Sequence, residues 1–133
     1  MEAYDSRSFL RRRSDKTPTM IASPWHMDAD TAGTAQGPER CINVWLPLQD
    51  VGSTTPSLEF VLGSHVQMKT MEFVGTGYYR TDDSVNALAG RKWRPVMRPG
   101  DAAVFDQYTL HRTQVLRSDQ FARTSCEFRF LGT

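Results

Sequence analysis

Short apolar segments separated by turn-forming residues constrain the fold of this chain more than any other feature. Such segments, rich in β-branched and aromatic residues, lie at 41–48, 58–62, 102–105, 110–116 and 122–131. Gly, Pro, Asp and Asn residues stand between them, and no segment has the spacing of a convincing amphipathic helix. We therefore predict an all-β fold, an antiparallel sandwich or barrel with little helical cover.

The N-terminal region differs from the rest in composition. Residues 1–16 are polar and charged, and we expect a loose arm or one short helical turn there, followed by a single domain over 17–133. The remaining expected elements are, in chain order, a strand at 17–28, a loop at 29–40, a short strand at 66–74, a surface loop at 75–90, a strand at 91–97 and a turn at 98–101.

Length, charge and cysteine content exclude several classes of protein. A chain of 133 residues is long enough for one domain, and its net charge of +1 gives no electrostatic reason to expect nucleic acid or an acidic membrane as a partner. No apolar run has the length of a membrane span, and the N-terminus is too charged for a signal peptide. Cys41 and Cys126 lie in apolar segments, so we interpret them as buried free thiols in a reducing, cytoplasmic compartment.

Two distant fragments carry residues that are suited to a metal site. His26 and Asp28 are one residue apart near the start, and His111 lies far downstream with Arg123 after it. Two histidines and one carboxylate are the ligand set of a mononuclear non-haem Fe(II) site with open coordination positions. On a strand, His26 and Asp28 would point to the same face. An arginine after the distal histidine is suited to hold a dicarboxylic co-substrate.

Each of these residues also has a structural interpretation. Either histidine can be a hydrogen-bonded core residue, Asp28 can open a turn, and Arg123 can pair with Glu127 on a strand surface. We interpret His65 as a turn or packing residue and Asp101 as part of a tight turn. The four residues together favour the metal site.

Four segments give the chain a family resemblance. They are Pro24–Asp28, Val44–Val51, Leu58–His65, and Pro99–Asp106 together with Leu110-His111. In order and separation they resemble the catalytic core of the phytanoyl-CoA dioxygenase family of Fe(II)/2-oxoglutarate oxygenases over roughly residues 20–131. The resemblance implies a double-stranded β-helix, that is, a cupin-like jelly roll.

The resemblance also implies a role for six residues. These are iron ligation by His26, Asp28 and His111, which makes them the catalytic residues, and 2-oxoglutarate binding by Arg123, Thr113 and Trp45. The guanidinium would hold the distal carboxylate with two parallel hydrogen bonds, and the Thr113 hydroxyl would add a third. Arg117 is an alternative to Arg123, but it lies too close to His111 for the family pattern.

The implied activity is a dioxygenase that hydroxylates a small organic substrate with molecular oxygen and decarboxylates 2-oxoglutarate to succinate. Asp28, where a smaller residue would make room for a halide, favours hydroxylation over halogenation. Two alternatives remain open: a catalytically inactive cupin-like binding module or truncated oxygenase fragment, and a metal-cupin enzyme that needs no keto acid. The substrate is not apparent, although Tyr78, Tyr79, Arg80 and Trp93 are suited to line a pocket.

The short N-terminal region is a departure from the family. Only 25 residues precede His26, where family members usually carry helices that cover the sheet. A jelly roll without that cover exposes apolar sheet surface. We therefore expect a homo-oligomer, or a chain truncated from a longer protein.

Overall fold

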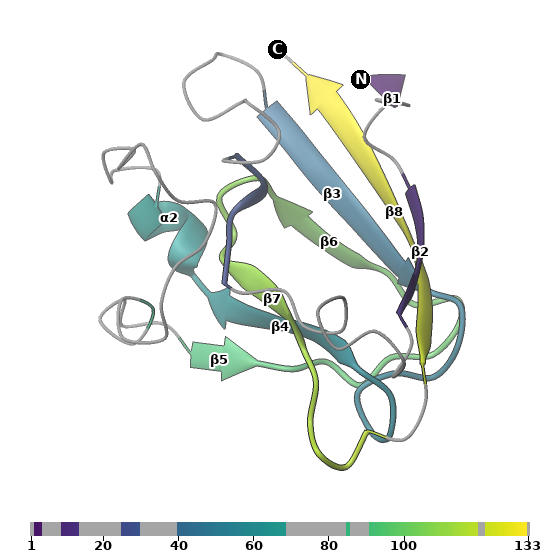
Figure 1. The fold of residues 1–133 in the computed structure, drawn as a ribbon. Coiled ribbons are helices and arrows are strands. Elements are labelled where there is room, and N and C mark those ends of the chain that lie inside the picture. The colour runs from purple at the N-terminus through teal and green to yellow at the C-terminus, as the bar shows by residue number, and fades with distance from the viewer. Residues whose placement is uncertain are drawn as a thin grey trace.

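The computed structural model describes residues 2–3, 9–13, 25–29, 40–68, 85, 91–119 and 122–132. These residues form two facing β-sheets and one short helix (Figure 1). The elements are β1 (Glu2–Ala3), β2 (Phe9–Arg13), β3 (Arg40–Pro47), β4 (Ser57–Leu62), α2 (Ser64–Met68), β5 (Arg91–Trp93), β6 (Ala103–Asp106), β7 (His111–Gln114) and β8 (Arg123–Gly132).

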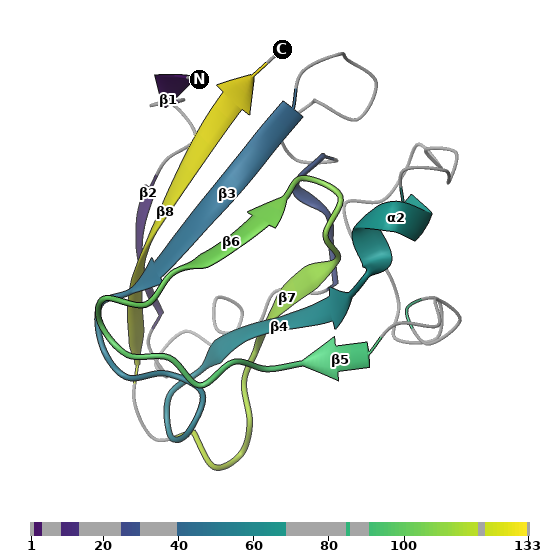
Figure 2. The same cartoon turned by 180° about the vertical axis from the view of Figure 1, so that it is seen from behind.

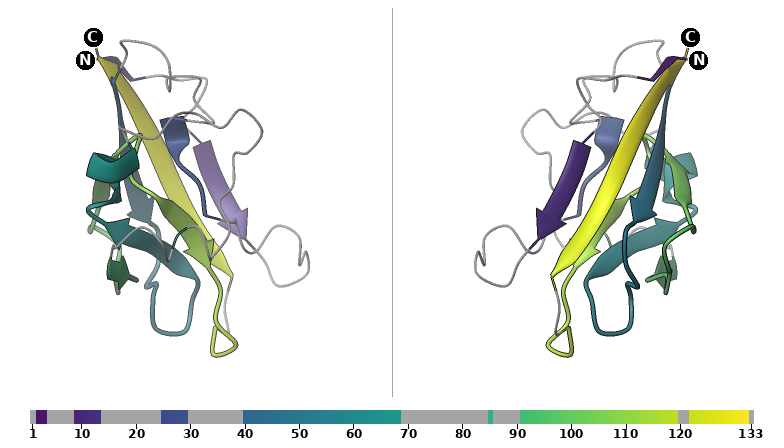
Figure 3. Two further views of the ribbon diagram at one scale, coloured as in Figure 1. Left: turned by 90° about the vertical axis from the view of Figure 1, so that its left-hand side faces the viewer. Right: turned by 90° about the vertical axis from the view of Figure 1, so that its right-hand side faces the viewer.

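Strands from distant parts of the chain form each of the two sheets. The first sheet has the order β1–β8–β3–β6, and β2 also pairs with β8. The second sheet has the order β5–β4–β7, and His26 extends it through a bridge to His111. The side views in Figure 3 show the two layers, and Figure 2 shows β6 and β5, each at one end of its sheet. All pairings are antiparallel, which is the arrangement of a jelly roll and confirms the predicted fold class.

Two apolar clusters lie on opposite faces of β4. Leu58 and Phe60 pack inside the roll against Trp45 and Phe105. Val61 faces the other way, into a second cluster on the outside of the second sheet. Because it lies between the clusters, β4 is buried on both faces over Ser57–Val61. The second cluster comprises Trp25, Met27, Ala29, Val61, Val85 and Leu110.

Turn residues fix the ends of the strands as the sequence predicts. The predicted turn at 98–101 is confirmed: the Asp101 N–H donates to the Arg98 carbonyl at 3.0 Å, and the Asp101 carboxylate accepts from the Arg98 N–H at 2.9 Å. Gly100 has a φ of 101°, a conformation that favours glycine. Asp101 is therefore a turn residue.

Three expectations about local structure are wrong. Glu2–Ala3 and Phe9–Arg13 are strands paired with β8, where we expected a loose arm, because the edge of β8 offers unpaired backbone groups. Residues 66–68 belong to helix α2, and the rest of the expected strand at 66–74 lies outside the described residues. Most of the expected strand at 17–28 is also outside them, and its last residue, Asp28, already has helical backbone.

Two further features are the burial of the two cysteines and the length of the helices. Cys41 and Cys126 are both free thiols, but only Cys41 is buried, since Cys126 faces outward from β8 and is partly exposed. Among the parts of the chain that the structure describes, no helix is long and apolar enough to cross a membrane.

Candidate metal centre

The backbone brings the two distant histidines together. His26 and His111 exchange both of their backbone hydrogen bonds, N–H to carbonyl, at 3.0 Å each. In an antiparallel ladder, residues that pair in this way carry their side chains on the same face. Accordingly, the two imidazole rings lie 4.3 Å apart between their centroids.

Asp28 joins the histidines by a different route from the one predicted. Helical backbone begins at Asp28, and the Ala29 N–H donates to the Gln107 carbonyl at 2.8 Å. The chain therefore turns into the roll, and Asp28 is 1% exposed. Its Oδ2 atom lies 3.7 Å from His111 Nε2.

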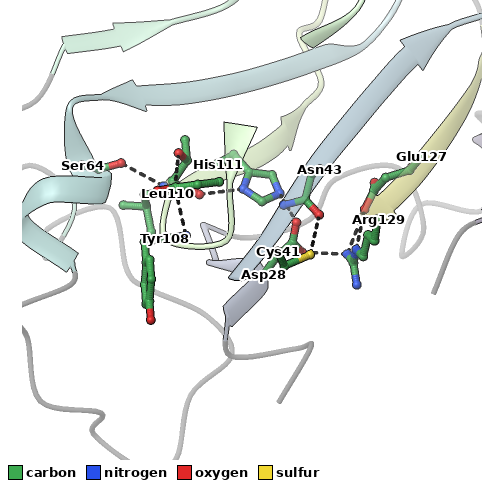
Figure 4. A network of polar contacts seen from close by, with 11 residues as sticks. Asp28, Cys41, Asn43, Ser64, Tyr108, Leu110, His111, Glu127 and Arg129 are labelled. Atoms are coloured by element: carbon green, nitrogen blue, oxygen red, sulfur yellow. Dashed lines mark hydrogen bonds and ion pairs between the residues drawn. The ribbon is translucent and has the colours of Figure 1, made fainter. Parts of the chain in front are cut away.

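A turn between β6 and β7 sets the orientation of the His111 ring. Asp106 Oδ1 accepts from the Tyr108 N–H at 3.1 Å and from the Thr109 hydroxyl at 2.8 Å. His111 Nδ1 lies 2.9 Å from the Thr109 carbonyl oxygen. Because a carbonyl can only accept, Nδ1 donates to Thr109, and Nε2 is the ring nitrogen that faces Asp28. Figure 4 shows the His111 ring directed toward Asp28.

The three side chains fit a single metal ion. One ligand atom from each of His26, Asp28 and His111 lies within 4.8 Å of the others. Two ligands at about 2.0–2.2 Å from one ion are separated by at most about 4.4 Å, so small side-chain movements suffice. Two neutral imidazoles and one carboxylate suit Fe(II) and leave other coordination positions open.

The three residues that we expected to bind the co-substrate also lie together. Arg123 Nη2 donates to the Thr113 hydroxyl at 3.3 Å, and the guanidinium lies 5.2 Å from the centroid of the Trp45 ring. Each of the three residues is at most 2% exposed. Gln49 fixes the backbone on both sides of Arg123, since it donates to the Ala122 carbonyl at 2.8 Å and accepts from the Thr124 N–H at 3.1 Å.

The metal cluster and the arginine line one small cavity. The lining residues come from both sheets, and they are His26, Asp28, Trp45, Leu58, His111, Thr113, Arg123, Ser125, Glu127 and Arg129. The cavity has a volume of about 30 Å³, room for an ion or a water molecule. The three candidate metal ligands thus lie next to the buried guanidinium of Arg123, between the two sheets.

Three polar residues of this cavity, Ser125, Glu127 and Arg129, were not predicted as site residues. Arg129 donates from Nη2 to Asp28 Oδ1 at 2.8 Å and also contacts Glu127 (Figure 4). Glu127, which the structural interpretation of Arg123 places on a strand surface, is a partner of Arg129 inside the roll. The sequence does contain a signal for these residues, since every second residue of β8 is polar over Arg123, Ser125, Glu127 and Arg129. The sequence did not reveal that this face points inward.

The other residues considered from the sequence lie elsewhere. His65 and Trp93 border a larger groove of about 790 Å³ between β4, β5 and β6, and His65 is not in the metal cluster. Phe60 and Phe105 also border this groove, and their rings contact His111 at centroid distances of 6.1 and 4.7 Å. Arg117 is exposed in the turn after β7. Tyr78, Tyr79 and Arg80 lie outside the described residues.

With this fold and cluster established, comparison with known sequences defines the class. The phytanoyl-CoA dioxygenase (PhyH) family matches residues 11–125, so the chain belongs to this family. No protein in the curated set matches the chain.

Solved structures support the same fold. The non-heme alpha ketoglutarate dependent epimerase SnoN from nogalamycin biosynthesis is 19% identical with a TM-score of 0.64, and the alignment covers 92% of this chain and 44% of SnoN. The apoform of EctD from S. alaskensis is 18% identical with a TM-score of 0.70, over 92% of this chain and 42% of EctD. The chain thus spans less than half the length of these two proteins.

Proposed function

We propose that the chain is the catalytic core of an Fe(II)- and 2-oxoglutarate-dependent dioxygenase that hydroxylates a small organic molecule. The observation that carries the proposal is the convergence of His26, Asp28 and His111 next to the buried Arg123. Membership of the phytanoyl-CoA dioxygenase family supports the general kind of reaction. SnoN has been solved with Fe3+ and alpha ketoglutarate, and EctD with 2-oxoglutarate and 5-hydroxyectoine, which supports the same cofactors here.

The overall reaction consumes one oxygen molecule. One oxygen atom would enter the C–H bond of the substrate as a hydroxyl group, and the other would enter succinate as 2-oxoglutarate loses carbon dioxide. When bound, ferrous iron would supply the oxygen activation that these steps require.

The residues of the chain would bind and orient the reactants. His26, Asp28 and His111 would hold the metal and leave other coordination positions open for ligands. Arg123 and Thr113 would anchor the distal carboxylate of 2-oxoglutarate, since a buried guanidinium is stabilised by an anion. Trp45 would exclude water from one side of the co-substrate.

Binding of 2-oxoglutarate requires movement in the cavity. A volume of about 30 Å³ suits an ion but is too small for a dicarboxylate. Trp45 contacts the Arg123 guanidinium, so we expect 2-oxoglutarate to alter the tryptophan fluorescence of the metal-loaded protein. Trp45→Phe should abolish this change, because Trp25 lies in the cluster outside the second sheet and Trp93 lies in the separate groove.

The decisive experiment is an aerobic assay with Fe(II) and 2-oxoglutarate that follows succinate. Uncoupled turnover should be detectable without the true substrate and should disappear in His26→Ala. Binding of metal and 2-oxoglutarate without any succinate would favour the alternative, an inactive binding module or a fragment. The chain spans less than half of the similar structures, which is the reason to retain that alternative. Absence of 2-oxoglutarate binding, with metal binding intact, would favour a metal-cupin enzyme that needs no keto acid.

Cellular context and assembly are further parts of the proposal. We propose one domain over residues 17–133 that acts in the cytoplasm on a small-molecule substrate, with molecular oxygen as co-substrate and no nucleic acid or membrane partner. We also propose a homo-oligomer. Exposed apolar side chains on the outer face of the first sheet support it, with Leu10 at 68%, Val104 at 65% and Phe128 at 42% exposure.

A further inference from the structure

A buried arginine contacts the carboxylate of the metal cluster. Arg129 is 9% exposed and projects into the roll from β8. Its Nη2 atom donates to Asp28 Oδ1 at 2.8 Å, whereas Asp28 Oδ2 is the oxygen that lies 3.7 Å from His111 Nε2. The two oxygens of Asp28 thus face different partners, one the guanidinium and the other the metal cluster.

Arg129 is itself held by a second carboxylate. Glu127 Oε1 accepts from Arg129 Nη2 at 2.8 Å and from Nε at 3.1 Å. These two bonds fix the plane of the guanidinium, which reaches Asp28 with the same Nη2 atom. Figure 4 shows Glu127, Arg129 and Asp28 in one line that leads to His111.

A third polar residue lies beside this line. Asn43 on β3 is directly opposite Arg129 on β8 in the strand register and is fully buried. Its Oδ1 atom accepts from the Cys41 thiol at 3.7 Å. The Asp28 carboxylate therefore lies in a polar wall that is built by β3 and β8.

We propose that Arg129 is a positioning residue that limits Asp28 to one metal-ligating oxygen. The inference rests on the proposed function. A carboxylate can bind a metal through one oxygen or through both. Because Arg129 occupies Oδ1, only Oδ2 is available, and Asp28 uses one coordination position instead of two. With two histidines as the other ligands, this would leave more coordination positions for the co-substrate and oxygen.

The charge of Arg129 alone does not provide this function. A lysine would keep the positive charge but presents a compact ammonium instead of a planar fork, so it cannot hold Glu127 and Asp28 in the same way. Outer partners of metal ligands typically change metal affinity by about 10- to 100-fold when they are altered. Arg129→Lys isolates geometry from charge for this reason.

The test is Co(II) binding to the whole chain, without 2-oxoglutarate, followed by the d–d absorption of the metal. Arg129→Lys should weaken Co(II) binding about ten-fold and change the shape of the spectrum. Arg94→Lys is the matched control. Arg94 pairs with Asp119 at 2.9 Å with side-chain exposures of 12% and 2%, close to the 10% and 1% of Arg129 and Asp28, but lies away from the metal cluster. The Arg94→Lys variant should have the Co(II) affinity and the absorption spectrum of the wild type.

A second variant keeps the test decisive if Arg129→Lys does not fold. Glu127→Gln removes the negative charge of the side chain that accepts from Arg129 and so weakens its hold on the guanidinium. It should change the same Co(II) spectrum with a smaller loss of Co(II) affinity. The inference is overturned if the folded variants bind Co(II) within two-fold of the wild type and with its spectrum. If the wild type binds no Co(II), the ligand set itself is wrong, and the proposed function fails with it.

Discussion

The two faces of β8 reverse the usual distribution of side chains in an antiparallel sheet. The inward positions are Arg123, Ser125, Glu127 and Arg129, and all four line the metal cavity. The outward positions include Cys126, Phe128 and Phe130. Sheets with one solvated face normally place apolar side chains inside and polar ones outside. The reversal agrees with the proposed ligand site on the inner face and with the proposed self-association through the outer face.

Neighbouring strands extend both faces. On the outside, Val44 lies between Phe128 and Val104 in the register of β8, β3 and β6, which makes an apolar row across the sheet. On the inside, Asn43 lies between Arg129 and Phe105 in the next row. On β3 and β8, the change from polar to apolar therefore occurs between adjacent positions, whereas β6 is apolar at both Val104 and Phe105.

The largest expected effect comes from removing a metal ligand on the inside of the roll. His26→Ala should weaken metal binding by about two to three orders of magnitude, since each ligand supplies a large share of the binding free energy. The backbone bridge to His111 uses main-chain atoms, so the fold should persist. Isothermal titration with Co(II) measures the loss. An unchanged affinity would mean that the cluster is not the metal site.

The next effect concerns Arg123, also on the inner face. Arg123→Met preserves much of the side-chain volume and removes two charge-assisted hydrogen bonds to the co-substrate, so 2-oxoglutarate should bind about 100-fold more weakly. Metal affinity should change little, because Arg123 is not in the metal cluster. Fluorescence titration of the metal-loaded protein with 2-oxoglutarate measures the first affinity, and calorimetric titration of the metal-free protein with Co(II) measures the second. Equal loss of metal and co-substrate binding would contradict the separation of the two roles.

A substitution on the outer face should change assembly and leave the site intact. Phe128→Glu places a charge in the apolar row and should weaken self-association about ten-fold or more. Sedimentation velocity over a range of concentrations measures this, and Co(II) affinity should remain that of the wild type. If the wild-type protein is monomeric at high concentration, our proposal that the outer apolar face mediates self-association is wrong.

The smallest effect is expected on the outside of the second sheet. Arg112 pairs with Glu59 at 2.8 Å and covers the Trp25 ring at 4.4 Å. Arg112→Met should lower the free energy of unfolding by about 1 kcal/mol, from a partly exposed ion pair and a cation–π contact. Urea denaturation measures the loss. A change of several kcal/mol would show that Arg112 contributes more than a partly exposed ion pair and one cation–π contact.

Much of the fold could be predicted because the pattern of apolar segments is local. The predicted segments at 41–48, 58–62 and 122–131 match β3, β4 and β8 within a residue or two. The predicted strand at 66–74 failed at α2, where a short apolar run did not distinguish a strand from a helix. The N-terminal strands were missed because pairing with the edge of β8 is a tertiary contact that a polar sequence does not reveal.

The sequence predicted most residues of the candidate site but not how they are arranged. His26 and His111 were identified by residue type, whereas their direct backbone pairing could not be, because register between distant strands is not encoded in a single segment. Asp28 was expected on the same strand face as His26, yet it reaches the cluster after the chain has left the strand. Arg129 was missed because its importance depends on which face of β8 is buried.

The ladder pair of His26 and His111 has a consequence for how the protein would acquire its metal. The two histidines come from segments far apart in the sequence, and the antiparallel pairing of those segments brings them together. An ion bound there would tie those segments together and resist their separation, so metal loading and folding would be thermodynamically linked. Release of the ion would then depend on local opening of this pair, and chelators should act at the rate at which the second sheet frays.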